Sequence, residues 1–179
     1  MTAFLYFAYR SNMLTERLQK RCPGATAIGM AVANNYCLRF SKRSTDSSGK
    51  ATLVASPGEK VHGILFRIFD IERDSLDKAE DYPNGYSRND GFQVTRDSNS
   101  SLVDATTYLA TKIEPNLLPY DWYRALVLAG AIQHGLPDSH IETLCKTAWK
   151  SDANACRPSR LAALHVLESA GFGFLVREG

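Results

Sequence analysis

Two short segments of the chain carry side chains that could do chemistry. The first is Tyr9-Arg10-Ser11-Asn12, a polar turn that follows an apolar run beginning at Phe4 and supplies a hydroxyl, an amide and backbone N–H groups. The second is Glu80, which ends a predicted short helix just before Pro83-Asn84-Gly85. A polar turn between a strand and a helix suits an anion or an oxyanion. The same turn also fits a plain helix start, with Ser11 or Asn12 as the N-cap.

The carboxylate of Glu80 has two features that predict a raised pKa. A helix C-terminus carries partial negative charge, which disfavours a second anion. An apolar cleft around the group would also desolvate it. A carboxyl group with a raised pKa can act first as a general base and then as a general acid. The alternative is that Glu80 is a solvated helix residue.

The elements that must position these two segments follow from the apolar patterning. Strands are predicted at 4–9, 26–33, 36–41, 51–56, 61–69, 86–96 and 102–111, and helices at 15–21, 71–80, 120–134, 138–148 and 159–170. Turns are expected at 34–35 and 57–58, and a mobile surface loop at 42–50. Strands first and helices later, without regular alternation, indicate an α+β fold.

Composition narrows the classes of function. The 179 residues are 44% hydrophobic and 22% charged, and the net charge of +2 does not favour nucleic acid or a membrane surface as a partner. The four cysteines form no C-x-x-C pair and none has zinc-ligand spacing to a histidine, so we expect reduced thiols and no metal site. Neither a secretory signal nor a transmembrane run is recognised, which predicts a cytoplasmic protein.

Several motifs, taken in order, resemble the γ-glutamylcyclotransferase family, also described as AIG2-like or BtrG-like. The family opens with a strand and a Y-G-S-N loop, here Tyr9-Arg10-Ser11-Asn12, and carries a Glu in an L-D-x-x-E context, here Leu76 to Glu80. A G-Y loop follows at Gly85-Tyr86. The remaining matches are Tyr108 in a strand, Pro119 to Tyr123 at a helix start, Gly130-Ala131 and Gly135-Leu136-Pro137. The segment 149–179 is not aligned.

The resemblance implies a fold and a reaction. The fold is one α+β domain over residues 1–179, with a mixed sheet or partly closed barrel, surrounding helices and a C-terminal helical segment at 149–179. The reaction converts a γ-glutamyl peptide or amine to 5-oxoproline and a free amine, with Glu80 as the catalytic acid and base. The implied substrate-binding residues are Tyr9, Arg10, Ser11, Asn12, Met13, Tyr86, Tyr108 and Tyr123. No cofactor or metal is implied, and the expected assembly is a monomer or homodimer that binds a small molecule.

Arg10 departs from the family pattern, which has glycine at this position. If the backbone needed a positive φ there, an arginine would cost roughly 1 kcal/mol. Arg10 could point to solvent, enter the pocket and bind an acidic group, or block the pocket. Two alternative functions therefore stay open: a non-catalytic binding protein of the same fold, and a related enzyme acting on a γ-glutamyl-acylated intermediate.

Overall fold

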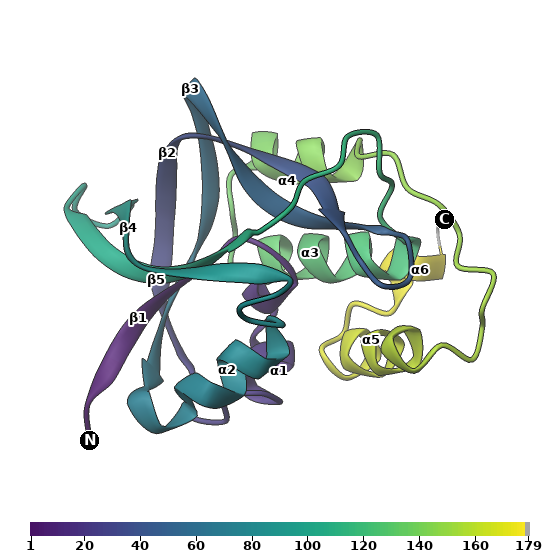
Figure 1. Cartoon of the computed structure of the whole chain (residues 1–179), viewed down its shortest axis with the longest axis horizontal. Helices are drawn as coiled ribbons and strands as arrows, with labels where there is room; N and C mark the ends of the chain where they lie inside the picture. Colours follow the sequence, from purple (N-terminus) through teal and green to yellow (C-terminus); the bar gives the residue numbers. More distant parts are fainter. Residues whose placement is uncertain (178–179) are drawn as a thin grey trace.

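A closed five-stranded barrel forms one side of the molecule, and most of the helices lie on the other (Figure 1). The computed structural model describes residues 1–177. The strands are β1 (Ala3–Ala8), β2 (Thr26–Arg43), β3 (Gly49–Phe69), β4 (Tyr86–Arg96) and β5 (Leu102–Ala110). They are arranged in the order β1-β3-β2-β4-β5. The predicted single α+β domain is confirmed, and the barrel is closed rather than partly closed.

Four of the strand pairings are antiparallel, and one short parallel contact closes the barrel. β1 runs antiparallel to β3, with Ala3 opposite Phe69 and Ala8 opposite Ile64. The parallel contact pairs Tyr6 of β1 with Thr106 of β5. This closure brings the C-terminal end of β1, where the polar turn begins, next to β5.

The α-helices in residues 1–177 have 4 to 13 residues, and the longest, α3 (Asp121–Gln133), is buried almost throughout. They are α1 (Thr15–Gln19), α2 (Arg73–Ala79), α3 (Asp121–Gln133), α4 (Asp138–Cys145), α5 (Pro158–Ser169) and α6 (Phe174–Arg177). Short 3-10 helices occupy Ser11–Met13 and Asp70–Glu72. In α3, every residue from Ala125 to Ala131 is buried. A helix that is apolar around its circumference belongs inside a core, and α3 lies between the barrel and the C-terminal helices.

Two apolar clusters follow from the alternation of side chains along the strands. Phe7 belongs to a cluster to which all five strands contribute, which fills the barrel, whereas Tyr6 and Ala8 join the larger cluster formed with the helices. The larger cluster includes Ala163, Val166 and Leu167 of α5. The segment that could not be aligned from sequence therefore packs on the same core as α3.

A glycine allows α3 to approach the polar turn closely. A Cβ atom on Gly130 would lie 2.5 Å from the backbone nitrogen of Leu14 and 2.6 Å from the Cβ of Met13. No side chain larger than hydrogen fits at this contact. The position of the turn after β1 is therefore set from behind by α3.

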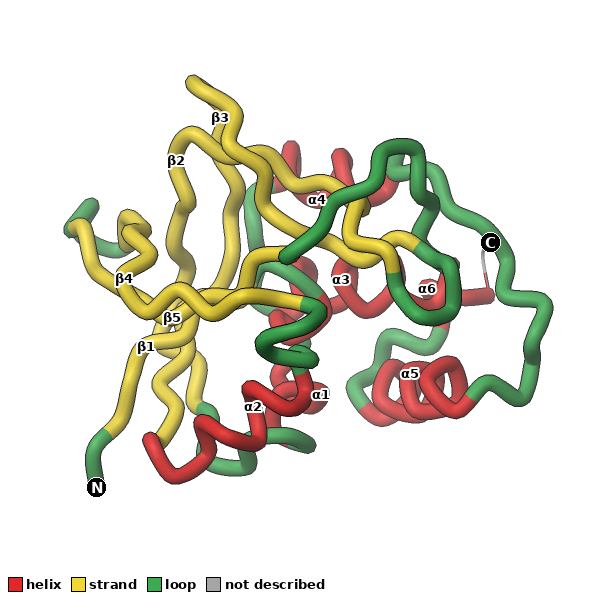
Figure 2. Tube along the Cα trace, in the orientation of Figure 1, coloured by secondary structure: helices red, strands yellow, loops and turns green. Residues whose placement is uncertain are grey.

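The structure corrects the predicted strand boundaries. The two predicted strands at 26–33 and 36–41 are one long strand, β2, and those at 51–56 and 61–69 are one long strand, β3. Both strands contain bulges, and together they form one hairpin (Figure 2). Between the pairs Asn34–Lys60 and Tyr36–Ala55, the single β2 residue Asn35, with φ of 63°, lies opposite residues 56–59 of β3. The side chain of Asn35 accepts a hydrogen bond from the N–H of Gly58 at 3.0 Å. Turn residues thus mark bulges here rather than strand ends. The predicted loop 42–50 shrinks to the five residues between β2 and β3.

Among residues 1–177, no helix is both long and apolar enough to cross a membrane.

Candidate functional site

The two segments singled out in the sequence meet at one place. The turn after β1 is a 3-10 helix at Ser11–Met13, closed by a hydrogen bond of 2.8 Å from the Met13 N–H to the Arg10 carbonyl. Glu80 is the C-cap of α2. Leu14, not Ser11 or Asn12, is the N-cap of α1, and no side chain caps that helix. The polar side chains of the turn are therefore free for another use, and they face Glu80.

The carboxylate of Glu80 is buried and held by three side chains. Arg10 donates from Nη2 to Oε2 at 2.7 Å, and Asn12 donates from Nδ2 to Oε1 at 2.7 Å. Arg21 lies 3.7 Å from Oε1 and also donates to the amide oxygen of Asn12 at 2.6 Å. The Glu80 side chain is only 4% exposed. An anion at this depth needs such partners, because burial without them would neutralise it.

The expected rise in the pKa of Glu80 is wrong. Burial alone would raise the pKa, but the nearby charges of Arg10 and Arg21 and the hydrogen bond from Arg10 outweigh burial and hold it below its usual 4.5. Sequence reasoning included the helix terminus and the apolar surroundings but no cation. The carboxylate of Glu80 is thus ionised at neutral pH.

Arg10 points inward, so of the three directions that the sequence left open, the one toward solvent is wrong. Arg10 is 6% exposed, and its Cζ lies 4.0 Å from the centroid of the Tyr86 ring. Its backbone, with φ of −127° and ψ of −155°, is extended, so an arginine causes no strain there. The predicted cost of a positive φ at this position does not arise.

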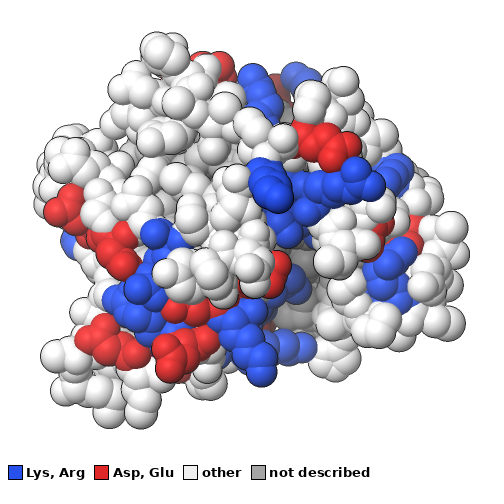
Figure 3. Space-filling model, viewed as in Figure 1, with Lys and Arg blue, Asp and Glu red and all other residues white. Residues whose placement is uncertain are grey.

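A small cavity opens beside this ion pair. Its volume is about 160 Å³, and Glu80, Arg10 and Ser11 form part of its wall with the rings of Tyr86 and Tyr123. Four further cations line it: Arg17, Arg21, Lys42 and Lys50. Figure 3 shows a hollow near the middle of the molecule with blue side chains along its walls. With Arg10, five cations face two carboxylates, Glu80 and Asp81, so the cavity is suited to an anionic ligand.

A second hollow adjoins the first. It has a volume of about 580 Å³ and shares Lys42, Ser44 and Asp81 with the cavity at Glu80. Its outer wall includes Lys112 and the Arg43–Glu114 ion pair. The two hollows together form a path from the surface to Glu80.

Comparisons with known proteins agree with this geometry. Residues 60–144 match the model of the AIG2-like family. Human gamma-glutamylcyclotransferase is 31% identical over 147 residues, which is 79% of this chain and 77% of the relative, and the mouse protein is 33% identical over 146 residues with the same coverage. The chain belongs to the gamma-glutamylcyclotransferase family.

Solved structures show the same fold. The solved structure of a gamma-glutamyl cyclotransferase superposes with a TM-score of 0.82 at 25% identity. The match covers 99% of this chain and 100% of the solved chain. An uncharacterised human protein also gives a TM-score of 0.82, at 27% identity, and covers 92% of this chain and 99% of its own. The family fold therefore extends over the C-terminal helices as well as the barrel.

The structure places the remaining predicted residues of this family member in different surroundings. Tyr86 and Tyr123 line the cavity, but both hydroxyls bind the backbone of Ala51, at 3.1 and 3.2 Å. Tyr9 lies beneath the site and donates to the carbonyl of Tyr108 at 2.6 Å. Met13 is fully buried in the core.

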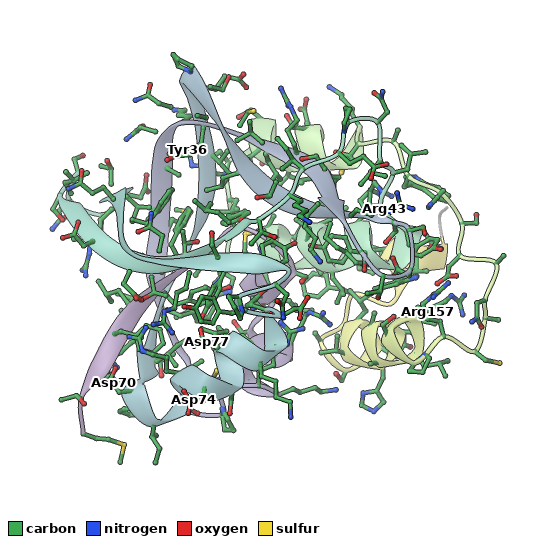
Figure 4. All side chains as sticks on the ribbon, viewed as in Figure 1. Tyr36, Arg43, Asp70, Asp74, Asp77 and Arg157 are labelled. Atoms are coloured by element: carbon green, nitrogen blue, oxygen red, sulfur yellow. The ribbon has the colours of Figure 1, made fainter. Side chains whose placement is uncertain are left out.

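Tyr108 is tied to α2 rather than to the cavity. Its hydroxyl donates to Oδ1 of Asp77 at 2.6 Å, and Arg88 pairs with the other oxygen of the same carboxylate. Figure 4 labels Asp77 on α2, one turn before Glu80. These contacts fix α2 against β4 and β5, and so fix the position of Glu80.

Sequence reasoning missed the cations and one tyrosine. Arg17 and Arg21 belong to the short segment after the polar turn, one helical turn apart, which was a readable signal. Lys42 and Lys50 flank the tip of the β2–β3 hairpin, and no local pattern connects them to Glu80. Tyr6 receives a hydrogen bond of 3.1 Å from the Asn12 amide. Among the described residues, no cluster of three or more His, Cys, Asp or Glu side chains could hold a metal ion.

Proposed function

We propose that this protein is a cofactor-independent γ-glutamyl cyclotransferase, which converts a γ-glutamyl peptide or amine to 5-oxoproline and the free amine. One observation carries the proposal: an ionised and buried carboxylate, Glu80, stands at the wall of a small, cation-lined cavity. The γ-glutamyl group brings an ammonium for the carboxylate and an α-carboxylate for the cations.

Proximity supplies much of the rate in this reaction. The α-amine and the γ-carbonyl belong to one substrate, so the cavity needs to hold a bent conformer in which the two groups touch. The volume of about 160 Å³ at Glu80 favours a folded glutamyl group over an extended one. The amine part of the substrate then extends into the adjoining hollow of about 580 Å³.

Glu80 moves the protons. Its carboxylate takes one proton from the α-ammonium, and the freed amine attacks the γ-carbonyl carbon to close a five-membered ring. The resulting tetrahedral intermediate collapses as the C–N bond to the attached amine breaks. Glu80 gives this proton to the leaving nitrogen and takes the second proton from the ring nitrogen, which becomes the neutral lactam N–H. The second proton passes to the released amine, which leaves as an ammonium. No atom is lost, and Glu80 ends the cycle ionised.

The turn after β1 supplies hydrogen bonds to the substrate. In this proposal, the N–H groups that follow Tyr9 stabilise the oxygen on which negative charge develops, or hold the α-carboxylate. Arg17 supports the second role, because it lines the cavity with a buried Nε that has no hydrogen-bond partner. Asn12 keeps Glu80 in position through its bond to Oε1.

The test measures 5-oxoproline formed from γ-glutamyl dipeptides, γ-glutamyl amines and glutathione. The intact protein is expected to act on at least one of them. Glu80→Gln should lower the rate by about 10²–10⁴-fold, because it removes the proton carrier. Asp81→Asn is the matched control: it alters the adjacent carboxylate of the same cavity, at a residue with φ of 53° that asparagine tolerates, and should lower the rate far less. Equal rates for the intact protein and Glu80→Gln would refute the role of Glu80.

The Arg10–Glu80 ion pair favours a second candidate function. A carboxylate already neutralised by a guanidinium at 2.7 Å could serve a protein that binds a small anion without turning it over. That candidate predicts saturable binding of γ-glutamyl compounds with no 5-oxoproline from any of them. Product from any substrate, lost in Glu80→Gln, would exclude it.

A further inference from the structure

The guanidinium of Arg10 occupies an unusual place for a buried arginine. It lies between the Glu80 carboxylate, 2.7 Å from Nη2, and the face of Tyr86, 4.0 Å from Cζ. An arginine has five N–H donors, yet the bond to Glu80 is the one hydrogen bond that this guanidinium makes among residues 1–177. The rest of the group faces the cavity that it lines.

Arg10 is needed at one oxygen of the carboxylate only: among residues 1–177 it is the sole partner of Oε2 of Glu80, whereas Oε1 has two others. Asn12 donates to Oε1 of Glu80, and Arg21 lies 3.7 Å from the same oxygen. Arg17 and Lys42 line the same small cavity and repel the guanidinium, against the stronger attraction of Glu80. Like charges at close range raise the free energy of the inward conformation. Its main attractions are Oε2 of Glu80 and the rings of Tyr86 and Tyr9.

A carboxylate beside an aromatic face is what an organic ammonium group prefers. The volume that remains, about 160 Å³, is below the roughly 300 Å³ at which small-molecule pockets usually begin. Part of the expected ligand space is therefore filled by the guanidinium itself.

The geometry points to Arg10 as a specificity-determining residue that stands in the place of the ligand's α-ammonium group. This inference rests on the proposed function for the identity of the ligand. A γ-glutamyl group must move the guanidinium away from Oε2 before its own ammonium reaches Glu80. A diacid of the same length without the amino group has no such conflict and binds with Arg10 in place.

The consequence is a measurable loss of apparent affinity for amino-bearing ligands. When a site is open for a fraction of the time, the apparent dissociation constant rises by the reciprocal of that fraction. An inward Arg10 for about nine-tenths of the time would thus weaken binding roughly tenfold. Once substrate is bound, Arg10 is displaced, so the effect falls on KM rather than on kcat.

L-glutamate and glutarate make a matched pair of probes, because they differ in the amino group alone and neither has an amide to cleave. Calorimetric titration of both ligands is compared for the intact protein, Arg10→Gly and Arg10→Gln. The extended backbone at residue 10 accepts any of these side chains, and thermal unfolding checks that each variant is folded. Both variants should bind L-glutamate at least tenfold more tightly and glutarate equally or more weakly.

Arg21→Gln is the control for charge alone. It removes a cation near Glu80 but leaves the Arg10 guanidinium in its place, and it should weaken the binding of both ligands.

For a γ-glutamyl dipeptide, Arg10→Gln should lower KM at least tenfold and change kcat less than threefold.

Unchanged or weaker binding of L-glutamate in both Arg10 variants would overturn the inference. An equal gain in affinity for L-glutamate and glutarate would also overturn the inference, since Arg10 would then block the cavity against both ligands alike. The binding result does not depend on turnover. Absence of 5-oxoproline from every variant would sink the proposed function, while the pair of titrations would still decide the role of Arg10.

Discussion

At the scale of single residues, the cavity at Glu80 is lined by five cationic side chains and by two carboxylates, Glu80 and Asp81. Lys50 is the one whose charge is most open to change. Burial lowers its pKa to about 8, although Asp46 opposes the shift with an ion pair at 3.4 Å. The ammonium also lies 4.5 Å from the ring centroids of Trp122 and Tyr123. Lys50 therefore helps to bind an anion at neutral pH and loses this charge as the pH rises through about 8.

Binding of an anion should consequently weaken between pH 7 and pH 9. We expect the affinity for 5-oxoproline, whose carboxylate is ionised throughout this range and which has no amine, to fall roughly three- to tenfold. Lys50→Arg keeps its charge at pH 9 and should flatten the pH dependence. Calorimetric titrations at the two pH values test this. The same pH dependence in Lys50→Arg would show that another group titrates.

At the scale of elements, the polar turn is held from both sides. Its side chains contact Glu80 at the end of α2, and its backbone rests on α3 at Gly130. Gly130→Ala would normally favour a helix, but here the new methyl group would meet the backbone of Leu14 at 2.5 Å.

The free energy of unfolding of Gly130→Ala should fall by about 1–3 kcal/mol, as in other overpacked cores. Activity should fall as well, because the displaced turn carries Arg10 and Asn12. Gly91→Ala is the control, since a Cβ there meets nothing within 4 Å, and it should change stability by less than about 0.5 kcal/mol. Urea denaturation measures both. A Gly130→Ala protein as stable as the parent would mean that α3 does not set the position of the turn.

The sequence predicted the elements of this site better than its interactions. The strand at 4–9 and the helix before Glu80 were predictable because their apolar periodicity is local. The inward direction of Arg10 was not, because it depends on a carboxylate 70 residues away. The continuous hairpin was missed because Asn35 and Gly58 are typical turn residues, which locally predict strand ends. Pairing of β2 with β3 on both sides of them makes this site a bulge instead.

At the scale of the whole molecule, one buried carboxylate ties the C-terminal segment to the core. Asp152, whose side chain is fully buried, accepts hydrogen bonds from Nε1 of Trp122 at 3.0 Å and from Nε of Arg157 at 2.6 Å. Figure 4 labels Arg157 in the connection before α5. Hydrogen bonding from Arg157 lowers the pKa of Asp152 to about 2. Because the pKa is lowered on folding, this contribution to stability is complete above pH 3.8 and is lost as the pH falls through about 2.

Asp152→Asn should loosen the docking of α5 on α3 at neutral pH. The amide cannot pair with Arg157 as an anion, so backbone amides of α5 should exchange with solvent faster while those of the barrel keep their protection. Glu142→Gln is the control, because it breaks an exposed ion pair with Lys146 that is worth little. Hydrogen exchange measured by mass spectrometry resolves the two regions. Unchanged hydrogen exchange in α5 would show that the contacts of Asp152 do not hold α5 on α3.

The central claim is that the cavity at Glu80 closes a γ-glutamyl group on itself, and the product formed in ¹⁸O-water tests it most directly. The substrate is the γ-glutamyl compound that gives the highest rate, and products are weighed by mass spectrometry. We predict unlabelled 5-oxoproline in equal amount to the released amine, and neither product above background with Glu80→Gln. Glutamate carrying ¹⁸O would contradict the account, since water rather than the substrate's own amine would then have attacked the γ-carbonyl.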